Sequence, residues 1–203
     1  MTGLIILSIL LVFCVILLVS YILFIKGLTA EKFNEFCNKK IGKISTKNNL
    51  KYLDKISLYN FAQEKVKIDS IIFGKKFIYL VTNSFLLGNV EGDKNDNSWI
   101  YYNRQSKTQK YIENLLDVGN KNIQEIAGIL AINAELLVSI AVTPNECNFN
   151  VKNAQEQQNF VTSYLKLSSK ISEFESKNVS VLKSEQINDK ISVLKKKNEE
   201  RKN

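Results

Sequence analysis

KIDSIIFGKKFIYLVTNSFLLGNVEG, residues 67–92, is the stretch from which the fold of this chain can be predicted. Its apolar residues are mostly β-branched or aromatic, and Gly74–Lys76 divides them, which is typical of two strands joined by a turn. A third strand is expected over Leu86–Val90. The first strand carries one acid, Asp69, and a carboxylate beside a buried strand is a common ligand in metal-dependent phosphodiester chemistry. The function therefore depends on whether Asp69 has partners.

The composition of the chain narrows the classes of function. The formal net charge of +8 and the pI of about 9.2 favour anionic partners, either nucleic acid or lipid headgroups. The sequence has no histidine, which excludes a Ser-His-Asp triad, a Cys-His dyad and an imidazole-containing zinc site. Cys14, Cys37 and Cys147 have the spacing of neither a disulfide framework nor a CxxC pair, so we expect reduced thiols.

The N-terminal segment predicts a membrane anchor. Leu4 to Ile25 contains no charged residue, and a helix of this length would span roughly 33 Å, enough for a bilayer core. No Lys or Arg precedes it, which argues against a cleaved signal peptide. The lysines that follow it are Lys26, Lys32, Lys39, Lys40, Lys43 and Lys47. Because positive residues stay inside, we expect a single-pass protein of the cell membrane with its C-terminal domain in the cytoplasm. These lysines either contact anionic lipid or only set the orientation.

Hydrophobic spacing predicts the remaining elements. Thr29 to Ile44 has helical spacing with Thr29 as a possible N-cap, and Leu136 to Val142 is a short apolar run typical of a buried strand. The other expected strands cover residues 58–61, 66–73, 77–81, 99–102 and 149–151, the last of them beside 136–142. The other expected helices cover residues 50–56, 109–133 and 160–167, with a C-terminal helix from Ser184.

Two segments, KIDSIIFGKKFIYLVTN and GNVEGDKNDNSW, resemble in this order the nuclease-related domain (NERD), a branch of the restriction-endonuclease-like superfamily. Members typically show an Ile-Asp strand, a second strand ending in Glu-x-Lys, a glycine-rich turn that leads to a Trp, and a helix with Asn, Gln and His. The matches here are Ile68-Asp69, the run 88–93 and Trp99, and residues 114–130 look like the family helix. The likeness extends over about residues 45–198.

This resemblance implies a fold class. We expect an α/β protein in which a transmembrane helix over residues 1–26 is followed by a basic juxtamembrane helical stalk over 27–48. Residues 49–203 would form a restriction-endonuclease-like mixed sheet flanked by helices, with a C-terminal helical tail.

The resemblance also implies a Mg²⁺-dependent nuclease core, in which a strand Asp and a second-strand Glu hold the metal and a Lys assists the attacking water. In this chain the family Glu falls at Thr82 and the family Lys at Ser84. The helix Gln and His fall near Val118 and Asn122. A hydroxyl replaces neither a carboxylate charge nor an ammonium group. Only Asp69 remains of the catalytic set, so we expect no metal and no cofactor.

The sequence thus favours a membrane-anchored NERD-like domain without catalysis, which acts as a binding or scaffolding module with nucleic acid as a candidate ligand. The residues expected to contact it are Lys75, Lys76, Lys94, Trp99, Arg104 and Lys107, together with Lys110, Tyr101 and Tyr102. The competing reading places the lysines on a solvated surface and the aromatic residues at a core edge.

Two alternative functions remain open at this point. In the first, the chain is an active Mg²⁺-dependent nuclease whose ligands have migrated, with Asp69 joined by Glu64, Glu91 or Glu125. In the second, it is a protein-interaction module at the membrane, for which the N-terminal helices and the helical tail would provide the surface.

Overall fold

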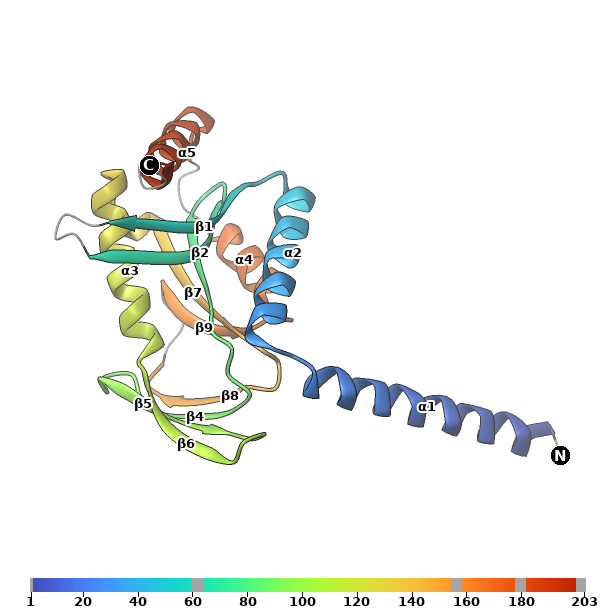
Figure 1. The fold of residues 1–203 in the computed structure, drawn as a ribbon. Helices are drawn as coiled ribbons and strands as arrows, with labels where there is room; N and C mark the ends of the chain where they lie inside the picture. The colour runs from blue at the N-terminus through green and yellow to red at the C-terminus, as the bar shows by residue number, and fades with distance from the viewer. Residues whose placement is uncertain (1, 60–63, 155–157, 178–181, 200–203) are drawn as a thin grey trace.

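A computed structural model of the chain describes residues 2–59, 64–154, 158–177 and 182–199 (Figure 1). These residues form a mixed α/β fold with two sheets and five α-helices. Sheet A has the strand order β1-β2-β3-β7-β9, in which β1, β2 and β3 pair antiparallel and β3, β7 and β9 pair parallel. Its strands are β1 (Lys51–Tyr59), β2 (Lys65–Phe73), β3 (Ile78–Asn83), β7 (Leu137–Thr143) and β9 (Asn159–Ser163).

Sheet B is smaller and lies at one end of sheet A (Figure 1). Its strand order is β6-β5-β4-β8, with a parallel pair only between β4 and β8. Its strands are β4 (Gly88–Asp93), β5 (Ser98–Asn103), β6 (Thr108–Glu113) and β8 (Asn148–Lys152). The mixed sheet expected from the sequence is therefore divided into two sheets.

Four helices enclose sheet A. α2 (Ala30–Asn48) and α4 (Leu167–Ser176) cover one face, and α3 (Leu115–Leu130) and α5 (Ser184–Glu199) cover the other (Figure 1). All residues of β7 are buried between these layers, as the continuous apolar run 136–142 predicts. A 3₁₀ turn, Ala134–Leu136, joins α3 to β7, and α1 (Thr2–Lys26) projects away from the layers.

α2 confirms the helix predicted from residue 29. The side chain of Thr29 caps it by accepting a hydrogen bond from the backbone N–H of Lys32 at 3.3 Å. Phe33, Cys37 and Ile41 follow at helical spacing and are buried against sheet A. The segment 27–48, for which we expected a stalk, thus contributes one stripe of α2 to the domain core.

The prediction of a transmembrane helix over residues 1–26 is wrong. The segment is helical, but none of the helices in the described part of the chain is long and apolar enough to cross a bilayer. This finding does not favour the expected single-pass arrangement.

The predicted short helix over residues 50–56 is also wrong, because this stretch belongs to β1. Leu53 and Ile56 fit a helical spacing, but β1 pairs with β2 on both sides of Lys55. For a short apolar run, such long-range pairing decides between helix and strand. Of the strand predicted over 58–61, residues 60 and 61 lie outside the described part of the chain.

Three further segments differ from the prediction. Residues 109–113 form most of β6 rather than the start of a helix, and α3 begins only after Asn114, whose side-chain oxygen accepts from the N–H of Leu116 at 2.9 Å. Residues 159–163 form β9, and α4 starts later, at Leu167. β8 pairs with β4 and not with β7. Strand pairing decides these cases, with the neighbouring strand β5 for β6, with β7 for β9 and with β4 for β8, and helical spacing does not report it.

Two short links connect the sheets. β3 continues through residues 84–87 into β4, and β7 continues through residues 144–147 into β8, so both strand pairs are parallel. The N–H of Ser84 donates to the carbonyl of Val142 at 2.8 Å, which holds the starts of the two links together. Gly88 enters sheet B with a φ of 153°, and a Cβ there would lie 2.0 Å from the carbonyl oxygen of Tyr102. Only glycine fits this close approach.

Candidate functional site

Asp69 lies at an irregular position of the β1–β2 ribbon, where the regular alternation of side chains between the two faces of the sheet is broken. Ile68 and Ile71 both pack toward α3, although side chains three residues apart in a regular strand point to opposite faces. Opposite Asp69, in β1, Lys55 has a left-handed φ of 52°, and this position is skipped in the strand pairing. The irregular pair places the Asp69 carboxylate beside the end of β3.

The carboxylate is engaged by the backbone. Its Oδ2 accepts a hydrogen bond from the N–H of Asn83 at 2.7 Å. Burial raises the pKa of Asp69, and the hydrogen bond from Asn83 partly offsets this by lowering it. A partly buried acid that completes the end of a strand fulfils a structural role.

The surroundings of Asp69 are polar but poor in charge. Thr82 and Asn83, at the end of β3, each have buried side-chain atoms without a hydrogen-bond partner among the described residues, and so does Asn122 in α3. The Cys37 thiol is buried in α2, and burial together with the Asp69 charge raises its pKa to about 12. Cys37 is therefore a neutral thiol at physiological pH.

These residues do not fit a magnesium site. Mg²⁺ is usually held by one or two carboxylates, and the neighbouring side chains at the end of β3 are the Thr82 hydroxyl and the Asn83 amide. Within the described ranges, no group of three His, Cys, Asp or Glu side chains could hold a metal ion. Of the acids considered as migrated ligands, Glu64 precedes β2 and pairs with Lys121 of α3 at 3.2 Å, Glu125 lies one turn further along α3, and Glu91 lies in sheet B.

The basic residues predicted to contact a ligand do not form one patch. Lys75 and Lys76 lie in the β2–β3 turn, where the Lys76 ammonium donates to the carbonyl of Lys177 at 2.5 Å. Lys94 follows β4 at one end of sheet B, whereas Arg104 and Lys107 lie in the β5–β6 turn at the other end. A six-residue strand separates these ends by about 20 Å.

Trp99 is a core residue and not an exposed stacking surface. Its side chain is fully buried, and its indole N–H donates to the carbonyl of Asp93 at 2.9 Å. Tyr101 points to the same side of β5 and is also buried, with its hydroxyl accepting from the N–H of Leu87 at 2.8 Å. Together with Val90 they form the inner face of sheet B, toward α3.

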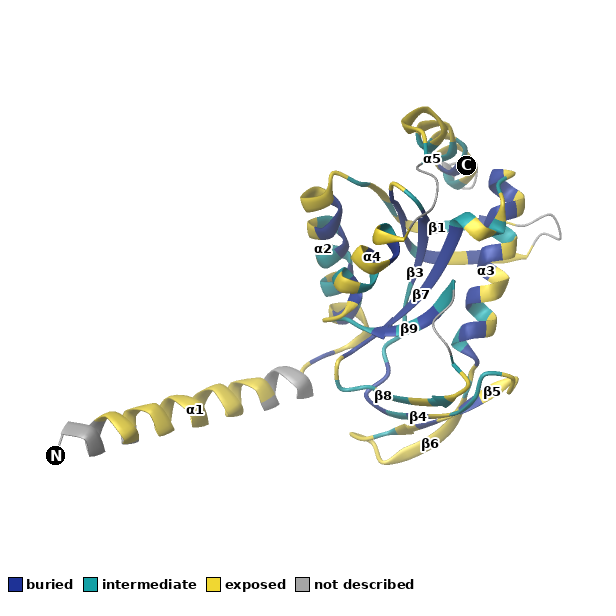
Figure 2. Ribbon diagram, turned by 180° about the vertical axis from the view of Figure 1, so that it is seen from behind, coloured by how far each residue is buried: buried dark blue, intermediate teal, exposed yellow. Residues whose placement is uncertain are grey.

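The opposite side, which we call the outer face of sheet B, is open to solvent (Figure 2). Side chains alternate along a strand, so the residues between the buried ones point outward. Tyr111 is 73% exposed, Tyr102 41% and Ile100 37%. The other side chains of this face include Asn89, Glu91, Gln109, Glu113, Asn148, Asn150 and Lys152. Tyr111 was missed as a candidate because the sequence placed it in a helix.

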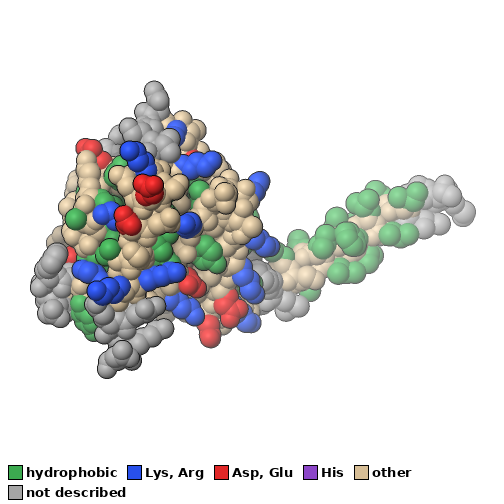
Figure 3. Space-filling model, turned by 90° about the horizontal axis from the view of Figure 1, so that it is seen from above, with side chains coloured by type: hydrophobic (Ala, Val, Ile, Leu, Met, Phe, Trp, Pro, Cys, Tyr) green, Lys and Arg blue, Asp and Glu red, His purple; other side chains and the backbone are tan. Residues whose placement is uncertain are grey.

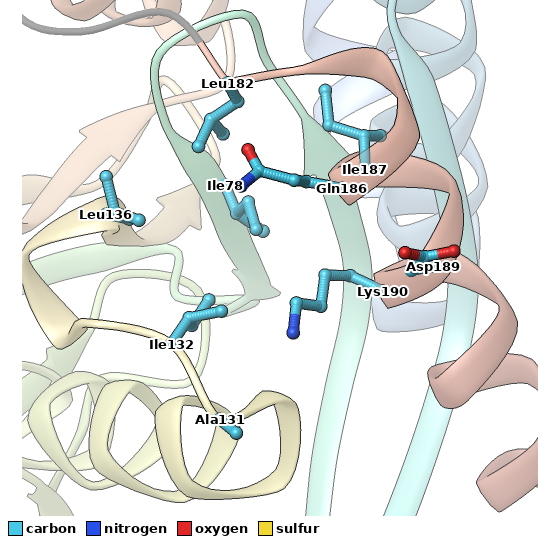
Figure 4. Close-up of a pocket in the computed structure, with 9 residues that line it drawn as sticks. All are labelled: Ile78, Ala131, Ile132, Leu136, Leu182, Gln186, Ile187, Asp189 and Lys190. Atoms are coloured by element: carbon cyan, nitrogen blue, oxygen red, sulfur yellow. The ribbon is translucent and has the colours of Figure 1, made fainter.

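A cavity of about 250 Å³ lies between the end of α3 and α5, away from sheet B, and Figure 4 shows the residues around it. Its mainly apolar lining consists of Ile78, Ala131, Ile132, Leu136, Leu182, Gln186, Ile187, Asp189 and Lys190. The Lys190 ammonium donates to the carbonyl of Leu130 at 2.7 Å and so ties α5 to α3. None of the predicted site residues lines this cavity, which lies at the interface where the C-terminal helix α5 packs on the domain.

Comparisons with known proteins add little. No family model matches the chain, and no curated protein is similar to it. A solved structure titled "Crystal Structure of Protein of Unknown Function AF1548" aligns with 73% of this chain and 72% of its own length, at 5% identity and a TM-score of 0.38. That likeness is too weak to support a fold or a function. The resemblance to the nuclease-related domain therefore stays a prediction from sequence motifs.

Proposed function

We propose that this chain is a nuclease-related domain without catalysis that binds nucleic acid. The environment of the Asp69 carboxylate is the observation that supports the absence of catalysis. Its carboxylate is bonded to the backbone of β3, and a hydroxyl stands at Thr82, where the family has its second acid. One engaged carboxylate cannot supply the ligand charge that a two-acid magnesium site requires.

Two observations support nucleic acid as the ligand. The net charge of +8 favours a polyanion, and such charge contributes a sequence-independent attraction to phosphates. The outer face of sheet B adds exposed Tyr102 and Tyr111, close to the cations of the β5–β6 turn. Exposed aromatic rings beside cations are the usual elements of single-strand binding surfaces.

The test combines cleavage and binding on the full chain, purified in a mild detergent. We expect no cleavage of single-stranded DNA, duplex DNA or RNA with Mg²⁺ or Mn²⁺, and binding at low salt that weakens as salt rises. Cleavage that disappears in Asp69→Asn would show an active nuclease and overturn the first half of the proposal. Absence of any binding at low salt would overturn the second half.

A second role, attachment to lipid, is favoured by the surface of α1. Its described apolar side chains are 48–67% exposed, and Figure 3 shows hydrophobic side chains along its visible surface. A continuous apolar surface of this extent is unfavourable when it is exposed to water. α2 follows within a few residues and is rich in lysine, which complements anionic headgroups. We propose that α1 attaches the domain to lipid, with the net positive charge of α2 favouring anionic headgroups.

Vesicle flotation tests this second role. The full chain is expected to float with vesicles that contain phosphatidylserine. Leu11→Lys, which places a charge on exposed α1, should reduce flotation, whereas the control Asn97→Lys, in an exposed turn of sheet B, should not. Equal flotation of both variants would exclude attachment through α1.

A further inference from the structure

We infer that the outer face of sheet B binds an unpaired nucleic-acid strand, with bases stacked on Tyr102 and Tyr111 and phosphates along Arg104 and Lys107. This inference rests on the proposed nucleic-acid function and assigns it a surface and a strand type. It replaces the stacking role that the sequence suggested for Trp99, whose ring is buried.

The two tyrosines are placed to hold separate bases. Tyr102 in β5 lies opposite Gln109 in β6, and Tyr111 follows two residues later on the same side of β6. Such diagonal neighbours in an antiparallel pair are about 7–8 Å apart. Each ring therefore has room for its own base, and Ile100, directly opposite Tyr111, extends the apolar floor between them.

Amide side chains surround this floor. Asn89 lies beside Tyr102 in β4, and Asn148 of β8 donates its side-chain N–H to the Asn89 amide oxygen at 3.1 Å. Gln109 and Asn150 are exposed on the same face. Amide groups both donate and accept hydrogen bonds, which suits the polar edges of unpaired bases.

The distribution of charge decides where the phosphates would lie. Arg104 and Lys107 are exposed in the β5–β6 turn, next to Tyr102. This turn is held by the Asn103 side-chain oxygen, which accepts from the N–H groups of Gln105 and Ser106 at 2.8 and 3.1 Å. Glu91, in the middle of the face, and Glu113, at its far end, repel phosphate, and the one cation of β8, Lys152, lies opposite Asp93. A strand is therefore expected to follow the Arg104 side.

An unpaired strand fits this face better than a duplex. Stacking on a tyrosine needs a base with a free face, and in a duplex the neighbouring base pairs cover both faces. The cations of the turn give attraction to either form. The tyrosines therefore provide the preference for single strands, and the turn provides part of the affinity.

Fluorescence anisotropy on the full chain in detergent tests the inference. The probes are a labelled oligothymidylate of about twelve nucleotides and a labelled hairpin duplex. We expect tighter binding of oligothymidylate, and about tenfold or more loss of that affinity in the Tyr102→Ala, Tyr111→Ala double variant. The Tyr102→Phe, Tyr111→Phe variant keeps both rings and should bind like wild type. The control is Tyr52→Ala, since Tyr52 is 42% exposed in a strand of sheet A.

Each alternative outcome overturns the inference in a recognisable way. If wild type binds oligothymidylate and the alanine variant binds equally well, the surface is wrong while the proposed function stands. If wild type binds neither probe at low salt, both fail. If sedimentation shows self-association that the alanine variant abolishes, the face contacts a second copy of the chain. Circular dichroism of the alanine and phenylalanine variants separates lost binding from lost folding.

Discussion

The Asp69 carboxylate accepts a hydrogen bond from the backbone N–H of Asn83 at 2.7 Å, at the point where β2 and β3 stop pairing. The last paired residues are Ser70 and Val81. Beyond them the side chain of Asp69 replaces the missing strand partner and satisfies a backbone donor. The acid that first suggested an active site therefore stabilises the end of β3.

We expect Asp69→Ala to lower the free energy of unfolding by about 1–3 kcal/mol, because the Asn83 N–H loses its acceptor. Asp69→Asn keeps an oxygen acceptor without the charge that burial disfavours, so it should cost less. Urea unfolding of the two variants measures the difference. Equal loss in both would mean that the charge, and not the acceptor, is what matters.

The stability should also depend on pH through Asp69. Burial raises its folded-state pKa above the unfolded value, so the folded protein keeps this proton to a higher pH. The contribution of Asp69 is therefore greatest below the unfolded pKa and is lost as the pH rises through the folded pKa. Urea unfolding across this pH range should show a decline in wild type, relative to Asp69→Asn. A relative increase over that window would contradict the direction of the shift.

Gly88→Ala should destabilise the protein by about 2 kcal/mol or more, since a φ of 153° is strained for alanine and the new Cβ would meet the Tyr102 carbonyl. Gly42→Ala is a suitable control. Gly42 lies in α2, where the nearest atom to a new Cβ is the Tyr52 hydroxyl at 3.4 Å, and alanine favours a helix by about 0.5–1 kcal/mol. Thermal unfolding should shift in opposite directions in the two variants.

Trp99→Phe should reduce stability without reducing nucleic-acid binding. The variant loses the indole hydrogen bond to Asp93 and leaves a space in the core of sheet B, at a cost of about 1–3 kcal/mol. Tyr111→Ala should show the reverse, with weakened binding and little change in melting temperature, because its ring is exposed. Weakened binding in a folded Trp99→Phe protein would mean that Trp99 belongs to the ligand site, which would contradict this prediction.

Alkylation tests whether α2 packs on sheet A. Burial and the Asp69 charge raise the pKa of the Cys37 thiol to about 12, so little thiolate exists at neutral pH and the side chain is inaccessible. Cys14 in α1 is exposed. We expect iodoacetamide to modify Cys14 in the folded protein and Cys37 only after denaturation, as read by peptide mass spectrometry. Rapid modification of native Cys37 would mean that α2 stands clear of the sheet.

The spacing of apolar residues predicted those helices and strands whose sequence pattern fits only one type of secondary structure. The β2–β3 hairpin, the capped α2 and the buried β7 are such elements, since their apolar residues face a core from one side or from both. The residues of α1 were predicted to be helical, and they are, but their apolar composition also predicted a membrane crossing that the described part of the chain does not support.

Strand pairing decided the rest. Leu53 and Ile56, and likewise Tyr111 and Ile112, fit a helix by spacing but lie in β1 and β6 beside other strands. The outer face of sheet B could not be predicted for this reason, because assigning Tyr111 to a helix removes it from the side of Tyr102. Asp69 was singled out from the sequence as a distinctive acid, but its bond to Asn83 depends on the end of strand pairing, which spacing does not report.

The two links between the sheets, residues 84–87 and 144–147, determine where the chain can tolerate insertions. Inserting one residue into 84–87 or 144–147 would turn β4 or β8 over, because side chains alternate with a period of two. Val90 would then face water and Glu91 the indole of Trp99. The exposed β5–β6 turn, by contrast, can accept additional residues without shifting any buried strand. Natural length variation in this protein should therefore collect in that turn and avoid both links.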